Sequence, residues 1–139
     1  MTMPLLQVND LKKHFPISGG LFGRTKSKVH AVDGVSFEIA RGETLSLVGE
    51  SGCGKSTVGR AILRLFDITA GQIVLDGLRI DDLGPHRLRE MRRRVQVVFQ
   101  DPFSSLNPRM RIRDILAEPI NNFGLAKDAA ERDARIAEL

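Results

Sequence analysis

The sequence predicts an α/β fold, in which short apolar strands alternate with amphipathic helices over 139 residues. The run TLSLV, Thr44 to Val48, is short, apolar and β-prone, which is typical of a buried strand. A glycine-rich stretch follows it directly. Beyond that stretch, apolar residues recur at helical spacing at Val58, Ala61, Ile62 and Leu65. Strand, glycine-rich turn and helix in this order form a unit of open α/β sheets.

The N-terminal part predicts further strands. Leu5 to Val8, with the LKKHF that follows, indicates a first strand and its exit. Pro16 to Lys28 is rich in Gly, Ser and Lys and predicts a loop. Val29 to Ala40 carries spaced apolar residues around an Asp33-Gly34 turn signal, and Arg41 to Glu43 then turns the chain into the TLSLV strand.

The segment after the first helix predicts a strand, an Asp76-Gly77 turn and a second short strand within GQIVLDGLRI. Pro85 suits the first turn of a helix that runs to about Met91. Val95 to Phe99, VQVVF, predicts another buried strand.

The C-terminal part begins with a polar, proline-bearing loop, QDPFSSLNPRM. Pro119 predicts a kink or a stop in the helix that follows. Asp128 with Glu131 three residues later resembles a capping box for a last helix. The apolar positions of the first of these helices are Ile112, Ile115, Leu116 and Ile120. We expect two domains, 1–100 with the β-rich portion and 101–139 with the start of a helical subdomain.

The stretch GESGCGKST fits the phosphate-loop pattern G-x-x-x-x-G-K-[ST], with Gly49 first and Gly54-Lys55-Ser56 last. Phosphate oxygens need several donors at once. Gly52 and Gly54 lack Cβ atoms, so the backbone can curl with its N–H groups pointing inward. The helix that starts near Lys55 adds unpaired N–H groups and the positive end of its dipole.

The motif assigns a role to each of its residues. Lys55 would reach the β- and γ-phosphates, and the Ser56 hydroxyl would bind Mg²⁺. Thr57 would support the α-phosphate, while Ser51 and Cys53 complete the loop. Cys53 is the one cysteine of the chain. We therefore expect a reducing compartment, and we expect a bulky adduct at Cys53 to obstruct phosphate.

Composition argues against other classes. The net charge is +4 and includes an Arg92–Arg94 run, but no aromatic residues interleave with it and no nucleic-acid motif accompanies it. We do not expect nucleic-acid binding. Neither a signal peptide nor a run of ~20 apolar residues is visible. A cytoplasmic location follows as an expectation.

These motifs resemble the ATP-binding subunit of an ABC transporter. The resemblance rests on Ala31 to Leu65, on GQIVLDG at Gly71 to Gly77 and on VVFQDPFSSLNPRM at Val97 to Met110. The wording GESGCGKST, the SLNP ending and the basic LFGRTKSK insertion are similar to the oligopeptide/dipeptide importer branch. The fold implied is a partial P-loop NTPase (RecA-like) sheet with an antiparallel β subdomain and the start of a helical subdomain.

The resemblance implies further site residues. Gln100 would be the Q-loop glutamine, a catalytic residue that contacts Mg²⁺ and the water near the γ-phosphate. Phe15 would stack on adenine, and the neighbouring His14 is the alternative. The third possibility is that Phe15 is an ordinary core residue with no role in binding. Phe103 to Met110 would form part of a surface that docks on the permease.

This sequence lacks three other parts of the family pattern: the signature, the Walker B strand and the switch histidine. Two stretches imitate them. ISGGL, Ile17 to Leu21, is similar to the family's signature but precedes the phosphate loop, and we interpret it as a flexible loop. QIVLDG is similar to a Walker B strand, but Gly77 replaces the needed glutamate, and a hairpin turn at Asp76 explains it better. We interpret His30 and His86 as surface residues.

The chain therefore resembles the front part of a longer protein. Alone, it should bind nucleotide, show no ATPase activity above background and be marginally stable. The resemblance implies ATP and Mg²⁺ as ligands, and membrane permease subunits, a second ATP-binding subunit and, indirectly, a substrate-binding protein as partners at the inner face of the membrane. Alternatives are an ATPase for nickel or another small solute, and a soluble ABC ATPase that acts in DNA repair or translation.

Overall fold

The computed structural model describes residues 3–17 and 27–139 of the chain. These residues divide into two compact units, Met1–Val95 and Gln96–Leu139, and we describe each by itself. The first unit holds all the described strands and two helices, and the second unit holds two helices. No described helix is long and apolar enough to cross a membrane.

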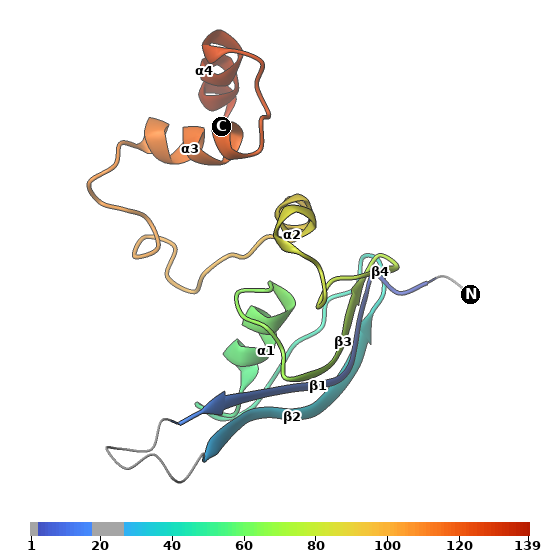
Figure 1. The fold of residues 1–139 in the computed structure, drawn as a ribbon. Helices are drawn as coiled ribbons and strands as arrows, with labels where there is room; N and C mark the ends of the chain where they lie inside the picture. The colour runs from blue at the N-terminus through green and yellow to red at the C-terminus, as the bar shows by residue number, and fades with distance from the viewer. Residues whose placement is uncertain (1–2, 18–26) are drawn as a thin grey trace. The chain divides into compact units, whose positions relative to one another are not determined.

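The first unit is built on a four-stranded antiparallel sheet in the order β2-β1-β3-β4 (Figure 1). Its strands are β1 (Leu6–Pro16), β2 (Lys28–Ile39), β3 (Ala70–Leu75) and β4 (Leu78–Arg79). β1 lies in the middle and pairs with β2 on one side and with β3 on the other. The expected antiparallel β portion is confirmed, and β1 continues to Pro16, through the residues that the sequence predicts as the exit of the strand.

β2 runs unbroken through Asp33 and Gly34, so the prediction of a turn there is wrong. Gly34 has a φ of +83°, and the register between β1 and β2 shifts beside it, from Lys12 opposite Asp33 to Leu11 opposite Val35. An Asp-Gly pair can supply a β-bulge as readily as a hairpin, because both need a glycine at positive φ. Here the long partner strand β1 holds the chain extended.

The core of this unit lies between the sheet and its helices. α1 (Lys55–Ile62) packs on one face of the sheet against β1 and β2, and α2 (Pro85–Met91) follows β4 (Figure 1). Alternating strand residues and one helix face meet there, as the period-2 and period-3.6 patterns require. The fully buried members are Val8, Leu11, Ala61, Ile73 and Ile80.

Two predicted strands are absent from the sheet. Thr44 to Val48 and Val95 to Phe99 form no strand, and most of their side chains are exposed, Val48 at 92% and Val98 at 91%. A strand forms when its N–H and C=O groups find a neighbouring strand. None of the four described strands pairs with either segment. Both predictions of a buried strand are wrong for this structure.

The turns and helix ends follow the sequence closely. Asp76 and Gly77 join β3 to β4 with φ values of +50° and +76°, as a tight hairpin requires. Pro85 stands in the first turn of α2, as expected.

The second unit consists of α3 (Ile112–Asn122) and α4 (Ala129–Glu138) after an irregular loop. α3 continues for three residues past Pro119, so that proline is not a stop. Asp128 caps α4 by accepting a hydrogen bond from the Glu131 N–H at 2.8 Å, while the Glu131 carboxylate accepts from the Lys127 N–H at 2.9 Å. The predicted cap is confirmed, with its returning bond displaced by one residue.

Candidate functional site

The glycine-rich loop is curled around the ammonium of its own lysine. Lys55 Nζ donates to the carbonyl oxygens of Gly49 at 2.7 Å and Glu50 at 2.6 Å, and it lies 3.4 Å from Cys53 Sγ. The positive charge therefore sits within the concave side of the turn rather than pointing into solvent. This is the position from which an ammonium can meet an incoming anion.

Two glycines are required by the loop's backbone. Gly52 and Gly54 have φ values of +85° and +97°, a region that side chains disfavour. At Gly54 space forbids a side chain as well, because a Cβ would lie 2.4 Å from the carbonyl oxygen of Ala31 on β2. The loop is thus seated directly on the sheet.

The N-terminus of α1 is open to a ligand. Gly54 is its N-cap residue, no side chain caps it and its first turn holds no acidic residue. Ser56 is exposed and Thr57 is half-buried in that first turn, while Ser51 is exposed in the loop. Unpaired N–H groups and the positive end of the helix dipole favour an anion at this point.

A cavity of about 350 Å³ lies beside the loop, between β2 and the start of α1. Both polar and apolar side chains line it. Its described lining consists of His30, Ala31, Val32, Asp33, Val35, Leu47, Val48, Cys53, Gly54, Lys55 and Val58. The loop therefore borders a space that could admit part of a ligand.

Phe15 lies near the end of β1 and is partly exposed, so it is not a core residue. Its ring meets Phe66 edge-on, with centroids 5.6 Å apart. Lys13 Nζ lies 4.9 Å from the Phe15 centroid and 4.8 Å from that of Phe66. His14 stacks on His30 instead, with one ring face covered. Neither Phe15 nor His14 is among the described residues that line the cavity.

Gln100 lies in the second unit, exposed in the loop before α3. It borders its own cavity of about 500 Å³, together with Phe99, Asp101, Ser104 and Ser105. The Asp101 carboxylate accepts from the Ser104 N–H at 3.2 Å, and this bond lowers the pKa of Asp101 from its ordinary value. Ser56 and Gln100 belong to different units, so their joint role at Mg²⁺ stays a prediction.

Asp76 occupies a hairpin and pairs with two arginines, Arg41 and Arg94. The interpretation of QIVLDG as a strand and turn, rather than as a metal-binding strand, is confirmed. The other imitation, ISGGL, falls almost wholly on residues 18–26, outside the described part of the chain.

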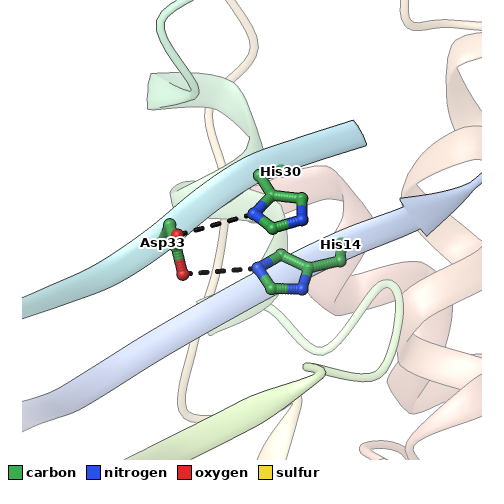
Figure 2. A group of neighbouring side chains, drawn as sticks. All are labelled: His14, His30 and Asp33. Carbon is green, nitrogen blue, oxygen red and sulfur yellow. Dashed lines mark hydrogen bonds and ion pairs between the residues drawn. The ribbon is translucent and has the colours of Figure 1, made fainter. Parts of the chain in front are cut away.

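One group of polar residues was missed by the sequence reasoning. His14, His30 and Asp33 lie side by side on β1 and β2, as Figure 2 shows. The prediction that His30 is a surface residue is confirmed, because its side chain is exposed, but the sequence did not reveal that it lies beside His14 and Asp33. The signal available was a histidine three residues before an aspartate; His14 could be added only with the strand register known.

The family of the chain follows from comparison with known proteins. The model of the family described as "ABC transporter" matches residues 32–139. The chain belongs to the ABC transporter family. Its strand, loop and helix elements are those of a partial P-loop NTPase cassette, as the similar solved cassettes described below also indicate.

Two curated members of the ABC transporter family are half identical to this chain. The oligopeptide transport ATP-binding protein AppF of Bacillus subtilis is 50% identical over 97% of the chain, and the glutathione import ATP-binding protein GsiA of Escherichia coli is 51% identical over 97%. The chain covers 41% of AppF and 22% of GsiA, and so spans less than half the length of either relative.

A solved ABC cassette has the same fold. The structure of MJ0796, described as a dimeric post-hydrolysis state bound to ADP and Pi, matches 96% of this chain with a TM-score of 0.74 and 27% identity. The chain covers 54% of that protein. The fold expected from the phosphate-loop pattern is therefore confirmed.

Proposed function

We propose that this chain binds MgATP as the nucleotide-binding part of an ABC importer's ATP-binding subunit. The observation that carries the proposal is the ammonium of Lys55, held within a glycine turn at the uncapped start of α1. The residues fit a polyphosphate because they supply a cation, several N–H donors at a helix terminus and an adjoining cavity.

Lys55 can bind a phosphate by exchanging its present hydrogen-bond partners for phosphate oxygens. Its two hydrogen bonds to Gly49 and Glu50 are made to neutral carbonyl oxygens, and bonds to phosphate oxygens are stronger because both partners are charged. Lys55 would exchange the former for the latter. Ser56 and Gln100 would hold Mg²⁺, with Gln100 also beside the attacking water. Phe15 would stack on adenine, a contact worth roughly 1–3 kcal/mol.

For the whole protein, we propose that ATP binding and hydrolysis drive the import of peptides. The names of AppF and GsiA, an oligopeptide transporter and a glutathione importer, support peptides as the substrate class. The subunit would pair with a second ATP-binding subunit and dock on membrane permease subunits at the inner face of the membrane. A substrate-binding protein would act through the permease.

Replacement of the loop lysine tests nucleotide binding. We expect Lys55→Ala to lower the affinity for a fluorescent ATP analogue in the presence of Mg²⁺ by at least about tenfold, because a charge-assisted contact of 1.5 kcal/mol or more is lost. Fluorescence titration measures it. Lys127→Ala, an exposed lysine of the second unit, is the matched control and should bind normally. Equal affinity of the two variants would refute the proposal.

Modification of Cys53 provides a second test that needs no mutation. Cys53 is exposed and lines the cavity beside Lys55, so a bulky maleimide adduct would fill the space that the phosphates need. We expect alkylation to block binding of the ATP analogue, and prior saturation with MgATP to slow alkylation. Full modification with unchanged binding contradicts this prediction.

A further inference from the structure

The cluster of His14, His30 and Asp33 has the composition of a metal site. The two imidazole rings stack with centroids 3.9 Å apart and an interplanar angle of 15°. His14 Nε2 lies 3.3 Å from Asp33 Oδ1, and His30 Nδ1 lies 3.5 Å from Asp33 Oδ2. Figure 2 shows both rings turning a nitrogen toward the same carboxylate.

An irregularity in the sheet creates this arrangement. His30 and Asp33 are three residues apart and would face opposite sides of an unbroken strand. The register between β1 and β2 passes from Lys13 opposite Val32 to His14 opposite His30, which leaves Ala31 as an extra residue. The extra residue resets the alternation, as a β-bulge does, and brings His30 to the side of Asp33.

We propose that His14, His30 and Asp33 bind a divalent transition-metal ion of the Zn²⁺ type, other than the Mg²⁺ of the nucleotide, at the edge of the cavity that His30 and Asp33 share with the phosphate loop. Two imidazoles and one carboxylate are ligands that Zn²⁺ takes readily, whereas Mg²⁺ prefers oxygen ligands alone. With three protein ligands, the remaining coordination positions would hold water.

The donor spacing suits this class of ion. Ligands of tetrahedral Zn²⁺ lie about 2.0–2.2 Å from the ion, which places neighbouring donor atoms roughly 3.3 Å apart. The two nitrogen–oxygen distances in the cluster match that value, and the donor atoms all lie within 4.8 Å of one another. Because a metal ion binds in the plane of an imidazole, His30 would have to turn out of its stack on His14 for both rings to hold one ion. The side chains of His30 and Asp33 are more than half exposed, which leaves them room to turn.

The local charges also favour a cation. The Asp33 carboxylate lies against both imidazoles and supplies the negative charge of the cluster. Of the two lysines before His14, Lys13 donates from its ammonium to the Asp67 carbonyl oxygen, and Lys12 has its ammonium paired with Asp10 at 3.6 Å. That pairing reduces its repulsion of a bound ion.

The chain contains three histidines, which makes a selective experiment possible. We would record histidine side-chain NMR spectra of the tag-free 139-residue chain while adding ZnCl₂ in the presence of excess Mg²⁺. We expect the imidazole signals of His14 and His30 to shift together and saturate at one ion per chain. The signals of His86, exposed on α2, should not move in the same range. Because this uses the unmodified chain, misfolding of a variant cannot imitate the result.

Calorimetric titration with Zn²⁺ then tests the ligands one at a time. We expect His30→Ala and Asp33→Asn each to weaken Zn²⁺ binding by at least about tenfold, since loss even of a residue that supports a ligand costs 10–100-fold. His86→Ala and Lys127→Ala, both at exposed positions outside the cluster, should bind Zn²⁺ as the unmodified chain does. Zn²⁺ binding that is absent, or that shifts only His86, or that survives in the two cluster variants with native circular dichroism, would overturn the proposal.

Discussion

Apolar, β-prone residues form strands in one part of the molecule and irregular, exposed chain in another. The first group is the antiparallel sheet, and the second is the segments Thr44 to Val48 and Val95 to Phe99. Val8, Leu11 and Ile73 are fully buried in the sheet, whereas Val48 and Val98 are almost fully exposed. Each strand of the first group has an antiparallel neighbour, and neither segment of the second group pairs with a described strand. An apolar β-prone run therefore becomes a strand only where another strand receives its hydrogen bonds.

This contrast has a consequence for solubility. Exposed valines and a phenylalanine that no strand covers form the kind of apolar surface that promotes association between chains. The antiparallel sheet lacks this problem on its buried face, because α1 packs there. Substitutions at three positions test how much the sheet, its hairpin and the exposed segments each contribute to stability.

The largest effect should come from the middle of the sheet. Leu11, on the inner strand β1, is fully buried, so Leu11→Ala removes apolar contacts and leaves a cavity. We expect the free energy of unfolding to fall by about 2–5 kcal/mol, measured by urea denaturation followed by circular dichroism. If that variant does not fold, Ile73→Val should show about 0.5–1.5 kcal/mol instead. A change near zero would mean that the sheet does not dominate stability.

A smaller, pH-dependent effect should come from Asp76. A hydrogen bond from Arg94, and a weaker contribution from Arg41, hold the pKa of Asp76 below its ordinary value, against partial desolvation, which raises it. Because the pKa is lower in the folded state, the ion pairs stabilise the fold at neutral pH and lose that effect as the pH falls through the folded-state pKa.

The matched variant is Asp76→Asn, which keeps a side chain suited to a positive φ. We expect a lower urea midpoint than that of the unmodified chain at pH 7, and midpoints that converge on acidification. A difference that stays constant down to pH 3 would assign the effect to the turn's conformation rather than to charge.

The smallest effect should come from the exposed segments. Val48 loses little contact when shortened, so we expect Val48→Ser to change the free energy of unfolding by less than about 0.5 kcal/mol while increasing solubility. Amide hydrogen exchange checks the same point, with fast exchange over 44–48 and protection in β1 and β3. A loss of 2 kcal/mol or more would show that this segment is packed after all.

The sequence predicted what depends on neighbours along the chain. The glycine turn before α1, the start of α1 at Lys55, the Asp76 hairpin and the Asp128 cap each depend on a few consecutive residues, and all are found. The segments Thr44 to Val48 and Val95 to Phe99 were wrongly predicted as buried strands, because strand formation and burial depend on partners far away in sequence. The His14 cluster was missed because its ligands meet across two strands, and only the register tells which residues oppose each other.

Because Ala31 is an extra residue in β2, the structure around it depends on the number of residues in this stretch more than on the identity of their side chains. Its carbonyl oxygen occupies the space that a Cβ on Gly54 of the phosphate loop would need, and its insertion sets the face on which His30 lies. Deleting one residue here would send Lys28 to His30 to the opposite face of the sheet and withdraw the support of the loop in the same step. Loop engineering of this chain should therefore change side chains around Ala31 and conserve the number of residues between Val29 and Val32.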